Sequence, residues 1–230
     1  MGGYDLHGFR NQVCQMNIRQ ARQSVIDTCL RMNALGINQG TSGNVSLRHK
    51  GAMLITPSGM PYDTLRPDDI VSIDMDGTSS GPRLPSSEWR MHLDILRGRT
   101  ETHAVVHTHS TYATAYSCLR NELPAFHYMI AVAGADTIRC ADYATFGTAA
   151  LSENMLRALE NRTACLLANH GVIATGETLE KALALAVEVE TLAKQYVIAC
   201  QAGSPIILDR DEMERVIEKF KTYGKQPDAT

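Results

Sequence analysis

The chain has 230 residues, a formal net charge of −3 at pH 7 and 44% hydrophobic residues, which is an ordinary composition for a globular protein. No stretch approaches the ~18 to 20 apolar residues that a membrane-spanning helix needs, and the start MGGYDLHGFRNQVCQMNIRQ has no apolar core of a secretory signal. No block of basic residues favours binding to nucleic acid. We therefore expect a cytoplasmic protein with neither a membrane nor a nucleic-acid partner.

The six cysteines are scattered, and no two of them have the C-x-x-C spacing that is typical of metal or redox sites. Several lie in apolar surroundings, such as Cys165 in TACLLANHG. This distribution predicts reduced, buried thiols, as in cytoplasmic proteins.

Helices and strands are mixed in the first half of the chain. We expect a loosely held arm over residues 1–16 and a helix over 18–35 that Gly36 ends. Residues 45–59 predict two strands joined by a tight turn at Lys50-Gly51, and residues 68–77 predict another strand entering a turn. A helix follows within 84–98, with Ser86 or Ser87 as the N-cap and Glu88 in the first turn.

The second half begins with a strand over 103–109 and a helix over 110–120, whereas residues 125–135 are ambiguous. A short strand and loop (138–148), a helix (152–160) and two strands (163–176) come next. The longest helix covers 178–201, and a last helix covers 211–224 before a flexible tail at 225–230. The lack of regular βαβ alternation predicts one α+β domain over residues 1–230, a three-layer αβα arrangement with a mostly antiparallel sheet.

Two histidines follow an apolar run in AVVHTHS. In a strand, residues i and i+2 point to the same side, so His107 and His109 could reach one ion. NHGV places His170 at the end of another apolar run, where a strand ends. Three neutral imidazoles and one carboxylate would suit Zn²⁺.

The carboxylate candidate is Glu88, in PSSEW. His92 lies four residues further on the same face of the predicted helix, so Glu88 and His92 form a rival pair of ligands. Spacing alone does not choose between His92 and His170. Other histidines, such as His49, are more typical of hydrogen-bonded or surface residues.

Eight motifs occur in an order that is highly specific: NQGTSGNVSLR, LITPSGMPY, LPSSEWRMH, AVVHTHS, FHYMIAVAG, YATFGT, LLANHGVIA and KFKTYG. Together they resemble the zinc-dependent class II aldolases, and within that family most closely the branch that acts on L-fuculose 1-phosphate. The resemblance covers about residues 17–224. It implies a single αβα domain, assembly as a C4 homotetramer, and active sites at subunit interfaces.

The resemblance also implies roles for individual residues. One Zn²⁺ per subunit would be held by Glu88, His107, His109 and His170, and not by His92. The substrate phosphate would be bound, without fixed positive charge, by Asn44, Ser58, Gly59, Ser86 and Ser87. Tyr128 of a neighbouring subunit would be the second proton donor, and Phe146 and Tyr223 would shape the aldehyde end of the site.

The expected reaction is the reversible cleavage of a ketose 1-phosphate to dihydroxyacetone phosphate and an aldehyde. Zn²⁺ would stabilise the carbanion next to the carbonyl, and Glu88 would leave the ion and transfer the proton. The sequence leaves open L-fuculose 1-phosphate, a 5-deoxyribulose 1-phosphate and a methylthio analogue. Alternatives on the same scaffold are a pentulose-phosphate 4-epimerase, which has Asp in place of Glu88 and lacks the following Trp-Arg, and a decarboxylase or dehydratase. A non-catalytic scaffold module is a further alternative, but such modules lack the metal histidines.

Overall fold

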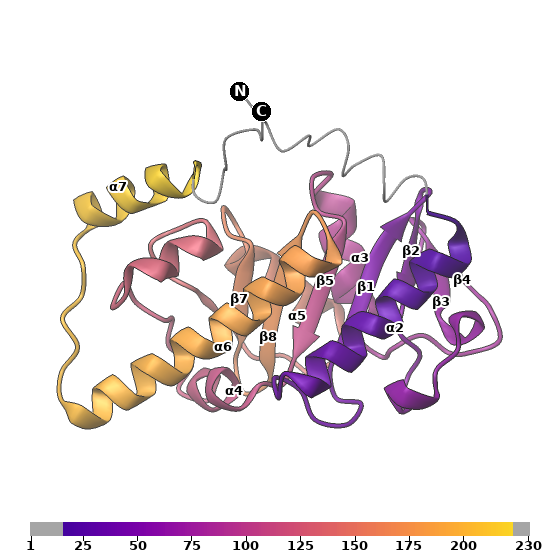
Figure 1. The fold of residues 1–230 in the computed structure, drawn as a ribbon, viewed down its shortest axis with the longest axis horizontal. Helices are drawn as coiled ribbons and strands as arrows, with labels where there is room; N and C mark the ends of the chain where they lie inside the picture. The colour runs from indigo at the N-terminus through magenta and orange to yellow at the C-terminus, as the bar shows by residue number, and fades with distance from the viewer. Residues whose placement is uncertain (1–15, 223–230) are drawn as a thin grey trace, which may run out of the picture.

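An eight-stranded sheet forms the centre of the protein, for which a computed structural model describes residues 16–222 (Figure 1). The strand order is β4-β3-β2-β1-β5-β8-β7-β6. The strands span Asn44–His49 (β1), Ala52–Ile55 (β2), Val71–Asp74 (β3), Ser79–Ser80 (β4), Ala104–Thr108 (β5), Cys140–Ala141 (β6), Ala164–Leu167 (β7) and Gly171–Gly176 (β8). All neighbouring pairs are antiparallel except β6 and β7, so the predicted α+β fold with a mostly antiparallel sheet is confirmed.

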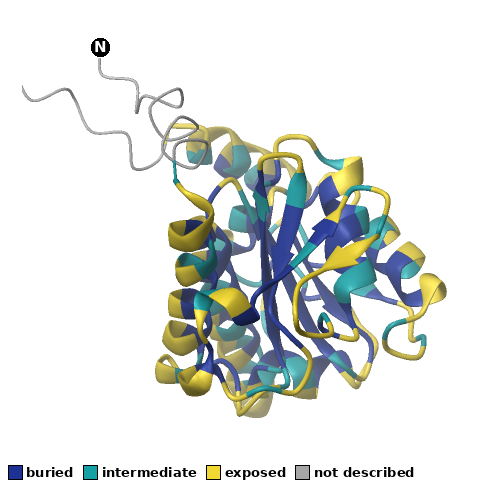
Figure 2. Cartoon of the chain, turned by 90° about the vertical axis from the view of Figure 1, so that its right-hand side faces the viewer, coloured by how far each residue is buried: buried dark blue, intermediate teal, exposed yellow. Residues whose placement is uncertain are grey.

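Helices cover both faces of the sheet, and each face has its own apolar core. One face packs against α2 (Ile18–Ala34), α4 (Thr111–Ser117) and α6 (Leu179–Ala202). The 3₁₀ helix η3 (Tyr128–Ala133) packs against α6, and α7 (Arg210–Phe220) packs against η3. The other face packs against α3 (Trp89–Gly98) and α5 (Ala149–Ala158). Figure 2 shows buried strands between two layers whose outer surfaces are exposed. Two short 3₁₀ helices, η1 (Tyr62–Thr64) and η2 (Pro67–Asp69), complete the structure.

The first hairpin has the tight turn that the sequence predicts. Lys50 and Gly51 have φ angles of 46° and 81°, as a two-residue turn with the right-handed strand twist requires. Strand β1 then alternates between the two faces. Val45 and Leu47 enter the core under α2, whereas Ser46 points to the opposite face, towards α3. The alternation therefore places polar residues of β1 opposite the helix that follows Glu88.

Several local expectations are wrong in detail. Helix α3 begins at Trp89, and Glu88 occupies the N-cap position without a capping bond from its side chain. Neither Ser86 nor Ser87 is the N-cap; instead, Ser86 Oγ accepts a hydrogen bond of 3.3 Å from the Glu88 backbone N–H. Helix α5 begins at Ala149, earlier than expected, because Thr148 accepts from the Leu151 N–H and caps it.

The expectations for segment 125–135, the cysteines and the chain ends are confirmed in part, wrong in part, or outside the described residues. The ambiguous segment 125–135 contains the 3₁₀ helix η3. The five cysteines of the described chain are free thiols, but Cys118 and Cys200 are exposed, so the prediction of buried thiols is wrong for these two. No helix within residues 16–222 is long and apolar enough to cross a membrane. Tyr223, the tail at 225–230 and all but the last residue of the expected arm lie outside the described residues.

Candidate metal centre and substrate cavity

Four predicted ligands come together at one end of the sheet. Glu88 precedes α3, His107 and His109 lie at the end of β5, and His170 precedes β8. One ligand atom of each of the four lies within 4.8 Å of the others. The three imidazole rings form a symmetrical group in which each pair of centroids is 4.9 Å apart. The antiparallel pairing of β5 and β8 produces this arrangement, because it brings the end of one strand to the start of the other.

The hydrogen bonding of His107 indicates that the four residues could bind a cation. His107 Nδ1 lies 2.8 Å from the Val172 carbonyl oxygen, so it carries the proton that this contact requires. In the neutral form that binds metals, the ring presents a lone pair at Nε2, which is 3.0 Å from His109 Nε2 and 3.2 Å from Glu88 Oε2. Acceptors that face one another in this way repel unless a cation lies among them. Without an ion, burial lowers the pKa of His107 but the Glu88 carboxylate raises it by more, so a proton takes the place of the cation.

The Glu88 carboxylate also indicates a cation-binding site. Its Oε1 atom is buried and lies 3.0 Å from His170 Nε2, but the two atoms are not aligned for a hydrogen bond and Oε1 has no other partner. A buried carboxylate oxygen without a donor is costly, whereas coordination to a divalent cation would satisfy it. The residues therefore fit a metal ion with one carboxylate and three imidazole ligands.

The charges of the group suit metal binding. Burial raises the pKa of Glu88, but His107 and His170 lower it by more, so the pKa lies well below its usual range and the group is a carboxylate at neutral pH. Burial, together with His107 and His170, lowers the pKa of His109 to about 4, so that this ring is neutral. Ionised carboxylates and neutral imidazoles are the forms that bind metals.

His92 does not belong to this group. It is fully buried, with Nδ1 2.8 Å from Ser46 Oγ and Nε2 2.5 Å from Asn44 Oδ1. The Asn44 amide in turn donates a hydrogen bond of 2.9 Å to Glu88 Oε2. Asn44, which the sequence assigns to the phosphate, thus contacts a predicted metal ligand. Sequence reasoning missed Ser46, although the polar alternation of Asn44 and Ser46 in a strand was a signal for it.

The two loops assigned to the phosphate lie side by side. An isolated bridge joins Pro57 to Pro85, with hydrogen bonds of 3.0 Å from Ser58 N to Leu84 O and 2.9 Å from Ser86 N to Thr56 O. Ser58, Gly59 and Ser87 are exposed, whereas Ser86 is buried. Hydroxyl groups from two segments distant in sequence are therefore available at one place on the surface.

A cavity of about 320 Å³ adjoins the metal-ligand candidates. Its lining includes Ser87, Glu88, His109, Phe146 and His170. Phe146, assigned to the aldehyde end, is 63% exposed, so its ring remains largely open to solvent beside the ligands. The cavity brings together a metal-ligand group, a serine hydroxyl and an aromatic side chain.

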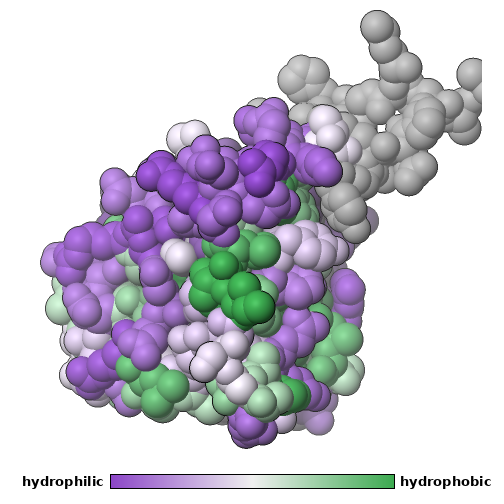
Figure 3. Space-filling view, turned by 90° about the vertical axis from the view of Figure 1, so that its left-hand side faces the viewer, coloured by the Kyte–Doolittle hydropathy of each residue, from purple (hydrophilic) through white to green (hydrophobic). Residues whose placement is uncertain are grey.

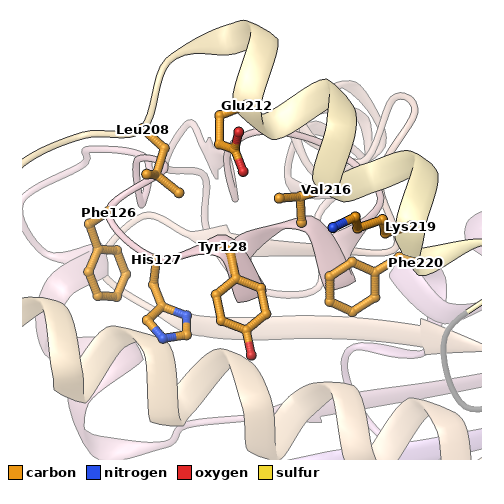
Figure 4. Close-up of a pocket in the computed structure, with 8 residues that line it drawn as sticks. All are labelled: Phe126, His127, Tyr128, Leu208, Glu212, Val216, Lys219 and Phe220. Carbon is orange, nitrogen blue, oxygen red and sulfur yellow. The ribbon is translucent and has the colours of Figure 1, made fainter.

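Tyr128 lies elsewhere in the same chain. It is 51% exposed and lines a second cavity, of about 580 Å³, between η3 and α7 (Figure 4). Figure 4 shows its ring between His127 and Phe220, with the hydroxyl group directed away from α7. None of the four metal-ligand candidates lines this cavity. Within one subunit the described structure therefore does not bring Tyr128 to the metal ligands.

The sequence profile described as "Class II Aldolase and Adducin N-terminal domain" matches residues 23–197. The chain belongs to this family, and the resemblance found in its motifs is confirmed. It is 57% identical over 203 residues to a 5-methylthioribulose-1-phosphate/5-deoxyribulose-1-phosphate aldolase of Rhodospirillum rubrum, covering 88% of this chain and 92% of the relative. It is 53% identical over 205 residues to the L-fuculose phosphate aldolase of Escherichia coli, covering 89% and 95% of the two chains.

A solved structure is similar over nearly the same length. An L-fuculose 1-phosphate aldolase superposes with a TM-score of 0.85 at 44% identity, covering 88% of this chain and 96% of the other. The family's name joins aldolases with adducin, so membership alone does not imply catalysis. The convergence of four ligand candidates is the observation in this chain that supports a metal-dependent activity.

Proposed function

We propose that this protein is a Zn²⁺-dependent aldolase that reversibly cleaves a ketose 1-phosphate to dihydroxyacetone phosphate and an aldehyde. The observation that carries the proposal is the convergence of Glu88, His107, His109 and His170 beside a cavity that Ser87 also lines. The candidate substrates are L-fuculose 1-phosphate, 5-deoxyribulose 1-phosphate and 5-methylthioribulose 1-phosphate, the sugars that appear in the names of the relatives.

One Zn²⁺ per subunit is the proposed cofactor. When bound, it supplies a Lewis acid that stabilises the negative charge developing next to the substrate carbonyl. Three neutral imidazoles suit this task, because they add no negative charge that would offset the charge of the ion. His107 is held in the required orientation by its hydrogen bond to the Val172 carbonyl.

Two protons move during cleavage. The bond between C3 and C4 of the ketose breaks, the C4 hydroxyl loses its proton as the aldehyde forms, and C3 gains a proton. We assign the proton at C3 to Glu88, the one carboxylate of the ligand group, which also lines the cavity. We assign the hydroxyl proton to Tyr128 of a neighbouring subunit.

The phosphate and the aldehyde are assigned to different residues of the proposed site. Two adjacent loops with exposed hydroxyls support the phosphate assignment, and the exposed Phe146 ring beside the ligands supports the aldehyde assignment. The proposed phosphate residues are Asn44, Ser58, Gly59, Ser86 and Ser87. The proposed aldehyde residues are Phe146 and Tyr223.

We further propose a cytoplasmic homotetramer with active sites between subunits. Figure 3 shows an apolar patch at the centre of a largely polar face, at the end of the molecule that carries α7. The connection from α6 to α7 exposes Ile206 and Ile207, which are 88% and 48% accessible. An exposed apolar patch of this kind favours association with another subunit, and free thiols favour a reducing compartment.

The test is an assay of the zinc-loaded protein against the three candidate ketose 1-phosphates, with release of dihydroxyacetone phosphate as the readout. Each sugar is paired with its unphosphorylated form, and the chelator-treated protein is the control. We expect cleavage of at least one phosphorylated sugar, and no cleavage after metal removal. Interconversion of epimers without release, or full activity in the metal-free protein, would refute the proposal.

A further inference from the structure

A buried chain of hydrogen bonds leads from Ser46 to Glu88. Ser46 Oγ lies 2.8 Å from His92 Nδ1, His92 Nε2 lies 2.5 Å from Asn44 Oδ1, and Asn44 Nδ2 lies 2.9 Å from Glu88 Oε2. Ser46 and His92 are both 0% exposed. Neither lines the cavity beside the metal ligands, so neither can touch a substrate there. Their place in the site is to act on Glu88 through Asn44.

The protons along this chain have one consistent arrangement. A carboxylate only accepts hydrogen bonds, so the Asn44 amide must present its NH₂ group to Glu88 and its carbonyl oxygen to His92. His92 must then carry its proton on Nε2. Complete burial keeps the ring neutral, so Nδ1 is an acceptor and the Ser46 hydroxyl donates to it.

We propose that His92 and Ser46 are positioning residues that fix the Asn44 amide, so that its NH₂ group holds the Glu88 carboxylate for proton transfer. This inference rests on the proposed aldolase function. The two ends of an amide are nearly the same size, so packing alone does not choose its orientation. A flipped Asn44 would place Oδ1 against Glu88 Oε2, which would repel the carboxylate.

Kinetics of two His92 variants give the first test. His92→Phe keeps an aromatic ring but removes both nitrogens, so we expect kcat to fall on the order of 10- to 100-fold, the usual cost of losing an outer partner of a metal ligand. KM for the ketose 1-phosphate and the zinc content should stay near wild type. His92→Gln offers an amide N–H to Asn44 Oδ1 and should recover most of kcat.

Loss of stability is separated from loss of positioning by Leu96→Ala. Leu96 is 1% exposed, lies one turn further along the same helix and packs into the apolar core, and its side chain takes no part in the hydrogen-bonded chain. This variant should lower Tm without a comparable fall in kcat. If Leu96→Ala lost as much kcat as His92→Phe at an equal loss of Tm, His92 would be a structural residue only.

A double-mutant cycle tests whether His92 acts through Asn44. Once Asn44→Ala has removed the amide, His92→Phe should cost little more, measured as the rate of proton exchange at the carbon of dihydroxyacetone phosphate. If the fold-losses in exchange rate of the two single variants multiplied in the double variant, the proposal would be overturned, because His92 would then influence the reaction by another route.

The positions of the protons on the His92 ring can be measured without an activity assay. ¹⁵N NMR of the metal-free protein should show His92 protonated on Nε2 and unprotonated on Nδ1. An active wild-type enzyme with His92 protonated on Nδ1 would refute the positioning role alone. A wild-type enzyme that neither cleaves ketose 1-phosphates nor exchanges the proton would refute the proposed function, and the positioning role with it.

Discussion

Gly171 packs directly against the backbone of Thr108: a Cβ atom at position 171 would lie 2.4 Å from the Thr108 carbonyl oxygen. The same atom would lie 3.0 Å from His109 Cδ2 and 3.3 Å from His107 Cε1. The absence of a side chain therefore lets β5 and β8 approach closely while two imidazole rings lie over the contact. Glycine is required here by space, since a backbone oxygen cannot move aside as a side chain can.

Gly171→Ala should separate these strands and displace His107 and His109 from each other. We expect the free energy of unfolding to fall by about 1–3 kcal/mol, as in other overpacked sites, together with weaker zinc binding. Urea unfolding of the metal-free protein and the zinc content after dialysis measure the two effects. Gly98→Ala is the matched control, because a Cβ there meets nothing within 4 Å. Zinc binding at the wild-type level in Gly171→Ala would contradict the prediction.

Substitution of Glu88 should mainly lower kcat, whereas substitution of a histidine ligand should mainly lower the zinc content. Glu88→Gln keeps the shape and one oxygen ligand but cannot take up a proton at neutral pH. We expect it to retain most of its zinc and to lose on the order of 10² to 10⁴ in kcat, the usual range for general acid/base catalysis. His107→Ala should lose metal and activity together.

Proton exchange at the carbon of dihydroxyacetone phosphate isolates this role, because the exchange needs no aldehyde. Glu88→Gln should exchange this proton far more slowly than wild type while carrying the same amount of zinc. Exchange at the wild-type rate would reduce Glu88 to a ligand, and the proposed proton transfer would then be wrong.

The phosphate assignment predicts sensitivity to added negative charge. Ser87 is exposed at the cavity, and the assigned residues include no Lys or Arg. Ser87→Asp should therefore raise KM for ketose 1-phosphates sharply, because the new carboxylate repels the phosphate. Ser79→Asp, an exposed serine in β4, should leave KM unchanged. Equal cleavage of phosphorylated and unphosphorylated ketoses by the wild type would show that the phosphate residues are wrongly assigned.

Acid should weaken the fold in part through Asp69. Its carboxylate accepts hydrogen bonds from Arg83 Nε (2.7 Å) and from the Arg66 backbone N–H (2.9 Å), and these lower its pKa. Because the folded pKa is below the unfolded one, this stabilisation is full above about pH 4 and is lost as pH falls through the folded pKa.

Asp69→Asn should thus lower the free energy of unfolding at pH 7 by about 1–2 kcal/mol, and the difference from wild type should shrink as pH falls below about 4. Denaturant unfolding of both proteins as a function of pH measures this difference in the free energy of unfolding. The control is Asp68→Asn, because Asp68 is 84% exposed and its pair with Arg22 contributes little. A deficit in Asp69→Asn that persists at low pH would contradict the assignment.

The sequence predicted the sheet and the ligand group because both depend on local patterns. The spacing of His107 and His109 needs only an extended strand to place both rings on one side, and the tight turn at Lys50-Gly51 needs only two residues that tolerate positive φ. The motif order then favoured His170, which spacing alone left in competition with His92, and the structure brings His170 and not His92 into the group with Glu88.

The sequence did not reveal the contacts that depend on how distant segments register against each other. Asn44 and His92 are 48 residues apart, and their hydrogen bond exists because β1 faces the first turns of α3. The N-cap of α3 was misassigned for a similar reason, since Ser86 pairs with the 56–59 loop instead of turning into the helix. Ser46 was missed because the polar alternation of β1 marks the residue but does not identify its partner, His92.

The proposed sharing of each active site between subunits predicts complementation. A subunit with Tyr128→Phe lacks the second proton donor but keeps its metal ligands, whereas a His107→Ala subunit lacks the metal but keeps Tyr128. Each homotetramer should be nearly inactive. After unfolding and refolding of an equal mixture, about a quarter of the sites in a cyclic tetramer should combine intact ligands with an intact Tyr128 from the neighbour. The measurements are the release of dihydroxyacetone phosphate by the mixture and by each variant refolded alone, with subunit exchange verified by native mass spectrometry. Mixed tetramers without recovered activity would show that Tyr128 does not act across the interface.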